Sequence, residues 1–287
     1  MAVMFDRLGK NSLAIEEYKL ALKADYDNSD IHLNLASSYI KNKEINKAVE
    51  ELGIAINFDP EAVEPHAILG LIYSLQNKPD EANREFEIAL QNASKLEPQN
   101  TEIYKSLGTV YLRQNKLKEA ESVYRLILDL TPQDAEAHFY LGTIYHEQKK
   151  KQLAEKEVKE AIKIKSDYPE ALNYLGYVYV EDNRNLGQAE SMINKALEME
   201  PDNGAYIDSL GWLYYKKGRL KEALVKIEKA SKLLEDPVIF DHLGDIYYKM
   251  GDKNNAEVNW QKSLQLDPTQ DLIKEKIHNL KIKNAAK

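Results

Sequence analysis

A sevenfold internal repeat constrains the fold of this chain more than any other feature. Leu followed by Gly or Ala, with Tyr three positions after the small residue, recurs along most of the 287 residues. The leucines of this motif are Leu35, Leu69, Leu107, Leu141, Leu175, Leu210 and Leu243. Successive leucines are 34, 38, 34, 34, 35 and 33 residues apart. A nearly fixed period of this length indicates an array of stacked structural units rather than one globular domain.

Each unit carries a second motif, which predicts a second helix. Ala stands first, a large apolar residue follows four positions later, and a small residue usually follows after three more, as in Ala48, Leu52 and Ala55. Such spacings place side chains on one face of a helix, and a closing proline such as Pro60 stops it. Gly or Ala where the two helices cross lets their backbones approach closely. One helix pair cannot bury its apolar stripe alone, so neighbouring pairs must stack.

The combined pattern resembles the tetratricopeptide repeat, whose signature is Leu-Gly, Tyr, Ala, an aromatic residue, Ala and Pro. The resemblance implies an all-α, right-handed superhelical solenoid of about eight helix-turn-helix repeats, the first truncated, with a C-terminal capping helix. The predicted units are residues 1–28, 29–62, 63–100, 101–134, 135–168, 169–203, 204–236 and 237–268, followed by the capping helix and tail at 269–287.

Departures from the period predict local changes in the stack. The unit at 63–100 has four extra residues near 91–94, which is one more turn on its second helix. The unit at 169–203 gains one residue in its turn, around 183–187, and Pro169 and Pro237 are expected to begin helices. Met1 falls where the first unit should have its leucine. Either the natural chain begins earlier or the first helix is short.

The last helix is expected to cap the array by covering its final apolar face. The residues expected to face inward are Leu272, Ile273, Ile277 and Leu280. The lysines expected to face water are Lys274, Lys276, Lys281 and Lys283. Membrane attachment through these lysines is the alternative interpretation.

Composition and motifs argue against catalysis, cofactors, metals and nucleic acid. The chain has no cysteine and a net charge of −8, which excludes thiolate sites and opposes binding to a phosphate backbone. No apolar run is long enough to cross a bilayer. His32, His66 and His138 share a register that holds Tyr104 and Leu172 elsewhere, which indicates a packing position. We therefore expect no enzyme, no cofactor and no metal, and the compartment stays open between the cytosol and a bacterial periplasm or envelope.

The predicted binding surface is the concave face, because first helices line it in tetratricopeptide proteins. The second half offers aromatic residues interleaved with carboxylates and an Asn, which suits a neutral or basic peptide. The predicted groove residues are Phe139, Tyr140, Asn173, Tyr174, Tyr177, Asp208, Trp212, Tyr215, Asp245 and Tyr248. The alternative is that several of these tyrosines pack between adjacent first helices.

One known binding mode of the family is not expected here. The clamp that co-chaperones use for a C-terminal carboxylate needs Asn where Thr109 and Tyr140 stand, and a basic residue where Tyr174 stands. The segment from Asn173 to Ala230 resembles bacterial tetratricopeptide proteins, many of them envelope-associated. The resemblance implies a protein–protein interaction scaffold. Self-association, or service as the recognition arm of a longer enzyme or of a secretion or assembly machine, remains the alternative.

Overall fold

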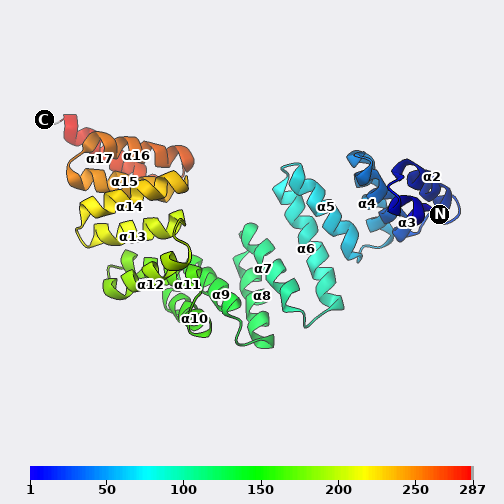
Figure 1. The fold of residues 1–287 in the computed structure, drawn as a ribbon, viewed down its shortest axis with the longest axis horizontal. Helices are drawn as coiled ribbons and strands as arrows, with labels where there is room; N and C mark the ends of the chain where they lie inside the picture. The colour runs from blue at the N-terminus through cyan, green and yellow to red at the C-terminus, as the bar shows by residue number, and fades with distance from the viewer. Residues whose placement is uncertain (286–287) are drawn as a thin grey trace. The chain divides into compact units, whose positions relative to one another are not determined.

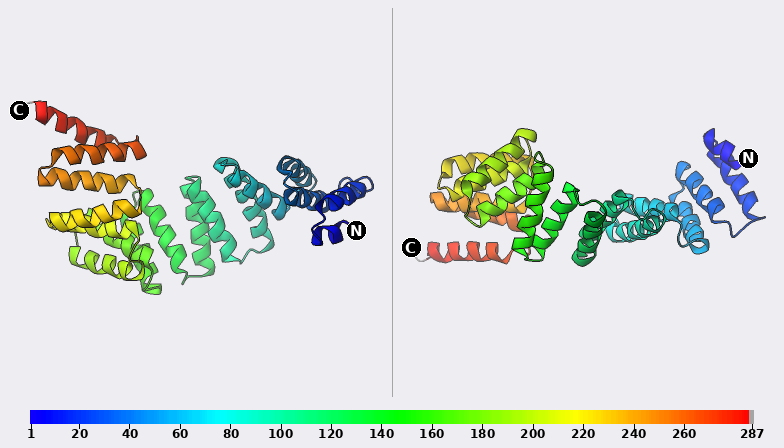
Figure 2. Two further views of the ribbon diagram at one scale, coloured as in Figure 1. Left: turned by 45° about the horizontal axis from the view of Figure 1, so that its top comes forward. Right: turned by 90° about the horizontal axis from the view of Figure 1, so that it is seen from below.

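A computed structural model describes residues 1–285, with side chains up to Ile282, and these residues form seventeen helices (Figure 1). Every regular element in this described part is helical, as the all-α prediction requires. The chain divides into two compact units, residues 1–149 and residues 150–287, which we call unit 1 and unit 2. In both further views, consecutive helices of each unit lie side by side (Figure 2).

The helices follow one another with short turns between them. The helices of unit 1 are α1 (Ala2–Arg7), α2 (Asn11–Leu22), α3 (Ser29–Lys41), α4 (Ile45–Phe58), α5 (Val63–Leu75), α6 (Pro79–Leu96), α7 (Thr101–Arg113), α8 (Leu117–Leu130) and α9 (Ala135–Glu147). The helices of unit 2 are α10 (Lys151–Ile164), α11 (Pro169–Glu181), α12 (Leu186–Met199), α13 (Gly204–Lys216), α14 (Leu220–Leu233), α15 (Pro237–Met250), α16 (Lys253–Leu266) and α17 (Asp271–Ala285).

Helices pair into hairpins at the small residue of the first motif, as the sequence predicts. In α7, a methyl group at Gly108 would lie 2.8 Å from the Tyr124 ring of α8. In α15, a methyl at Gly244 would lie 2.3 Å from the Trp260 ring of α16. The absence of a side chain at the glycine is therefore what allows the aromatic residue of the second helix to reach the crossing. Tyr124 and Trp260 are buried as a result.

Backbone capping fixes where first helices begin. Side chains of Asn28, Asn100 and Asp134 accept hydrogen bonds from backbone N–H groups at the starts of α3, α7 and α9. Asn203 and Asp236 do the same for α13 and α15. These caps satisfy N–H groups that have no partner within the helix, so these five helices begin at defined residues.

The predicted departures from the period are present. The second helix α6 has 18 residues, whereas the second helices α4 and α8 have 14. The longer turn before α12 places Asn183 and Asn185 in the left-handed region, with φ of 48° and 51°. Pro169 and Pro237 stand at the first turns of α11 and α15. The six-residue helix α1 precedes α2 at the start of the chain.

The final helix covers the end of unit 2, but one predicted inward residue points outward. Ile273, Ile277 and Leu280 of α17 are buried in a cluster with Trp260. Leu272 is 74% exposed, so the prediction for it is wrong, because it lies one position off the buried face of the helix.

The predicted exposure of the cap lysines also needs a correction. Lys276 is not free in solvent, because its ammonium group contacts Asp241 and Asp245 of α15. Lys274 and Lys281 are exposed as predicted. The side chain of Lys283 lies outside the described residues.

Candidate functional site

The first helices of unit 2 form one continuous surface. Helix α11 packs against α13, and α13 packs against α15. We call the polar and aromatic side chains of this surface the aromatic–acidic lining. Its members are Tyr177 and Glu181 of α11, Asp208, Trp212 and Tyr215 of α13, and Asp241, His242 and Asp245 of α15.

The indole of Trp212 is at the centre of the lining. Its ring stacks on His242 at 3.9 Å between centroids and on Tyr215 at 4.4 Å. Its Nε1 donates a hydrogen bond to Glu181. The side chain of Trp212, one of the predicted groove residues, is only 6% exposed. It joins the three helices, and its neighbours carry the accessible surface.

A buried ion pair lies beneath the indole. Nδ1 of His242 is 3.0 Å from both carboxylate oxygens of Asp208, and both side chains are buried. Burial opposes the charged imidazolium, but the Asp208 carboxylate outweighs it and holds the pKa of His242 above its ordinary value. Asp208, one of the predicted groove residues, is buried and orients His242 under Trp212.

At the end of the lining, two carboxylates already hold a cation. Nζ of Lys276 donates to Asp241 at 2.7 Å and lies 2.8 Å from Asp245. Burial and the neighbouring Asp245 carboxylate raise the pKa of Asp241, although Lys276 counteracts this. Asp245 also accepts a hydrogen bond of 3.1 Å from the Trp260 indole. This part of the surface therefore combines acidic oxygens with an aromatic ring around an ammonium group.

The raised pKa of Tyr177 reflects the negative electrostatic potential of the lining. Its ring lies 6.4 Å from His242. Burial raises the pKa of its hydroxyl, and the carboxylates of Glu181, Asp208 and Asp241 raise it further. An anionic tyrosinate is therefore disfavoured here, and by the same field a cation is favoured.

The other predicted groove residues fall into two places. Asn173 and Tyr174 are half-buried on α11, and Tyr248 of α15 is 38% exposed beside Trp260. Phe139 and Tyr140 belong to unit 1, where Tyr140 stacks on Tyr124 at 5.2 Å. The structure thus gathers eight of the ten predicted residues within unit 2.

Four participants lie outside the predicted set. One of them is His242, which stacks on Trp212. Glu181, six positions after the signature leucine of α11, accepts the Trp212 hydrogen bond. Asp241 and Lys276 complete the cation site. The position of Glu181 in the repeat was a usable signal. Nothing in the period indicates Lys276, because α17 has no signature motif.

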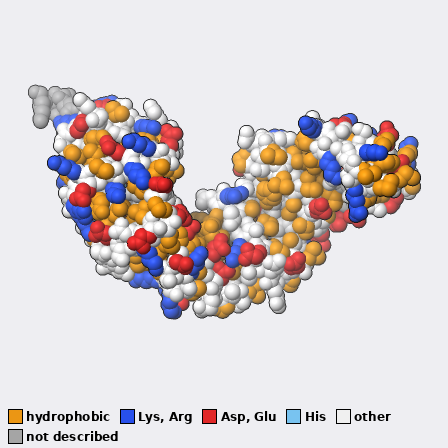
Figure 3. Space-filling model, in the orientation of Figure 1, with side chains coloured by type: hydrophobic (Ala, Val, Ile, Leu, Met, Phe, Trp, Pro, Cys, Tyr) orange, Lys and Arg blue, Asp and Glu red, His pale blue; other side chains and the backbone are white. Residues whose placement is uncertain are grey.

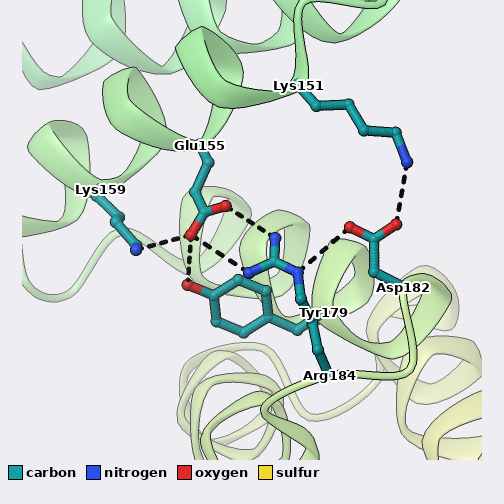
Figure 4. A network of polar contacts seen from close by, with 6 residues as sticks. All are labelled: Lys151, Glu155, Lys159, Tyr179, Asp182 and Arg184. Atoms are coloured by element: carbon teal, nitrogen blue, oxygen red, sulfur yellow. Dashed lines mark hydrogen bonds and ion pairs between the residues drawn. The ribbon is translucent and has the colours of Figure 1, made fainter.

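A second polar cluster in unit 2 supports structure rather than chemistry (Figure 4). Arg184, in the long turn, donates 2.8 Å and 3.4 Å hydrogen bonds to the two oxygens of Glu155, and Tyr179 adds a third of 3.0 Å. Arg184 lowers the pKa of Glu155 to about 2. Asp182 bridges Arg184 to Lys151. Every charge faces an opposite charge, so the cluster ties the α11–α12 turn to α10.

Residues 1–282, whose side chains the structure describes, contain no group of three or more His, Asp or Glu side chains arranged to hold a metal ion. Within the same described stretch, no helix combines the length and the apolar character that a membrane span requires.

Comparison with known proteins points to one family. Two family models, both described as tetratricopeptide repeat, match the chain. The first matches residues 69–135 and 127–169, and the second matches residues 169–203 and 239–270. Together they match more than half of the chain. A Caenorhabditis elegans protein O-mannosyl-transferase is 29% identical over 93 residues, which is 32% of this chain and 14% of that protein. The chain therefore spans about a seventh of that relative.

Solved structures share the fold at low sequence identity. A tetratricopeptide repeat protein from Parabacteroides merdae is similar over 88% of this chain and 98% of its own, with a TM-score of 0.66 and 19% identity. The Cut9–Hcn1 hetero-tetramer of APC/C is similar over 94% of this chain and 52% of that chain, with a TM-score of 0.64 and 19% identity. Yeast Tom70 is similar over 98% of this chain and 61% of that chain, with a TM-score of 0.55 and 18% identity. With its repeated motif, its Gly–aromatic crossings and these matches, the chain belongs to the tetratricopeptide repeat family.

Proposed function

We propose that this protein is a non-catalytic interaction scaffold that binds a basic segment of a partner protein on the aromatic–acidic lining of unit 2. The observation that carries the proposal is the position of Lys276. The lining already binds this ammonium group between Asp241 and Asp245, with the Trp260 ring centroid 5.8 Å away. A Lys or Arg side chain of a partner would meet the same chemistry further along the lining.

The open part of the lining offers that chemistry beside Glu181. This residue is exposed, and the rings of Tyr177 and Tyr215 are half-buried. Nζ of Lys216 lies 5.0 Å from the Trp212 ring, so a cation is compatible with the rings here. Cation–π contacts of this kind contribute about 0.5–1 kcal/mol at exposed sites and more when desolvated. Aromatic rings add contact area with little loss of side-chain entropy.

The structural neighbours support a role in assembly. The Cut9–Hcn1 structure is a hetero-tetramer of APC/C, so this type of array can serve as a component of a multiprotein complex. The low identity extends only to the fold, and the basic partner is inferred from the lining alone.

A second candidate follows from the curated relative described above. Because the matching 93 residues belong to a protein O-mannosyl-transferase, an array of this kind can occur in a longer enzyme. In that role, this chain would bind the protein substrate while another domain performs the reaction. The full-length reading frame distinguishes the two, since an adjacent catalytic domain would support the second candidate.

The test uses a fluorescein-labelled decapeptide that alternates Arg and Ser, with a counterpart in which Glu replaces Arg. Fluorescence anisotropy measures binding to the native protein and to Glu181→Gln. The Gln side chain can still accept the Trp212 hydrogen bond, so the variant removes charge and keeps the packing. We expect two- to fivefold weaker binding of the Arg peptide, as for an exposed ion pair.

The matched control is Glu198→Gln, the same change at an exposed position of α12. It should leave binding unchanged. Equal binding of the Arg and Glu peptides, or equal losses in the two variants, would refute a basic partner on this surface.

A further inference from the structure

Unit 1 contains a cavity of about 420 Å³ that the proposed function does not use. Helix α6 forms its floor with Phe86 and Ala89, while Ala67 of α5 and Thr109 of α7 stand on its two sides. Seven of its ten lining residues are apolar, and the other three are Ser106, Thr109 and Arg113. Its volume lies within the range of about 300–1,000 Å³ that is typical of pockets that bury a ligand.

Small side chains on the first helices create this space. One position before the signature leucine, α7 has Ser106, whereas α11 has Tyr174. Two positions after it, α7 has Thr109, whereas α11 and α13 have Tyr177 and Trp212. The two rings that α11 has at these positions are missing in α7. The cavity is therefore a consequence of the sequence of this repeat.

An exposed apolar stripe extends the cavity along α5. Val63, Ala67, Leu71 and Leu75 are four residues apart and so lie on one face of the helix. The first two line the cavity. Leu71 is 58% exposed and Leu75 is 87% exposed. Hydrophobic side chains gather visibly over α5 and α6 (Figure 3). At about 1.5 Å per residue the stripe is about 18 Å long, which matches three turns of a docked helix.

The charge at this groove has the opposite sign to that of unit 2. Arg113 of α7 is the single charged side chain that lines the cavity among the described residues. It is exposed and has no ion-pair partner in the described part of the chain. Lys105 of the same helix, by contrast, is neutralised by Asp134, Glu102 and Glu136. The guanidinium is therefore available to a carboxylate from outside.

We infer that this groove binds an amphipathic helix of a partner protein that presents large apolar side chains at i and i+4 and an acidic residue toward Arg113. The apolar residues enter the space above Phe86 and Ala89 and extend over Leu71. The carboxylate pairs with the guanidinium, for which arginine geometry is well suited. This is the helix-in-groove mode of recognition, and it does not depend on the proposed function of unit 2.

The test measures anisotropy with a labelled, end-blocked 14-residue peptide that has Leu at every fourth position on an Ala and Gln background and two Glu at one end. A second peptide has Lys in place of Glu, and a third has Ser in place of Leu. The native protein should prefer the first peptide. The Ser peptide should bind roughly 10- to 100-fold more weakly, as expected for lost Leu burial.

Two variants locate the site. Ser106→Tyr combined with Thr109→Tyr fills the cavity with a residue that α11 holds at both positions, so the fold should persist, and binding should fall at least tenfold. Arg113→Glu, at an exposed position, should reverse the preference between the Glu and Lys peptides. Ser122→Tyr on the exposed face of α8 is the matched control and should bind like the native protein.

Several results would overturn the inference. They are undetectable binding of the Leu–Glu peptide by the native protein, an unchanged charge preference in Arg113→Glu, and full binding by the filled variant when circular dichroism shows it folded. Binding of dodecanoate without binding of peptide would indicate a lipid-chain pocket instead. A dimer in sedimentation that the filled variant abolishes would indicate a second copy of this chain as the occupant.

Discussion

Substituting alanine for two helical glycines should change stability in opposite directions. At Gly244, a new Cβ would lie 2.3 Å from Cδ1 and 2.4 Å from Nε1 of Trp260. The indole is 3% exposed and is anchored by its hydrogen bond to Asp245. The ring must rotate or the α15–α16 crossing must widen. At Gly53 in α4, no atom outside the local backbone of the helix lies within 4 Å of the new Cβ.

The magnitudes decide the sign of each effect. Ala is favoured over Gly within a helix by about 1 kcal/mol, and this gain applies to both variants. At Gly244 it is opposed by overpacking of about 1–3 kcal/mol and by loss of a hydrogen bond of about 1 kcal/mol. We expect Gly244→Ala to lower the free energy of unfolding by about 1–3 kcal/mol. Gly53→Ala should raise it by about 1 kcal/mol.

Urea unfolding followed by far-UV circular dichroism measures both changes. Repeat arrays do not always unfold in one step, so the comparison rests on the transition that each variant shifts. A Gly244→Ala protein that is as stable as the native one would refute the close crossing of α15 and α16. Equal shifts in both variants would show that helix propensity alone governs these positions.

Three further predictions concern polar and aromatic contacts in unit 2. The pKa of Glu155 is lowered to about 2 in the fold. Its pairing with Arg184 therefore stabilises the fold above the ordinary Glu pKa of about 4.3, and this stabilisation is lost as pH falls toward 2. The difference in the free energy of unfolding between native protein and Glu155→Gln, about 1 kcal/mol at neutral pH, should vanish near pH 2. The pKa of His242 is raised in the fold. Its pair with Asp208 is therefore fully stabilising below about pH 6.5, and this stabilisation is lost as pH rises through the raised value. Titration of His242 followed by NMR should show the raised pKa, and Asp208→Asn should lower it. Trp212→Ala should cost about 3–5 kcal/mol in urea unfolding, and a loss under 1 kcal/mol would contradict the burial of this ring.

Helix pairing was predictable because it depends on short-range spacing. The interval between a signature leucine and its following alanine fixes which face of each helix is apolar. The extra turn of α6 and the turn around Asn183 could be predicted for the same reason, since an insertion into a strict period must lengthen either a helix or a turn.

Exposure within the lining was less predictable, because it depends on how closely successive first helices approach. In unit 2 they touch, and Trp212 and Asp208 are consequently buried between them. The cavity beside Thr109 was missed for the converse reason. Ser106 and Thr109 do not belong to the repeated motif, and the effect of their small side chains depends on the neighbouring Ala67 of α5.

Backbone amide NMR during titration with the Arg–Ser decapeptide tests the central claim most directly, because it identifies the helices that the ligand contacts. The account predicts that shift changes concentrate on α11, α13 and α15, around Glu181 and Tyr215. Changes confined to the second helices α12, α14 and α16, or to unit 1, would contradict it.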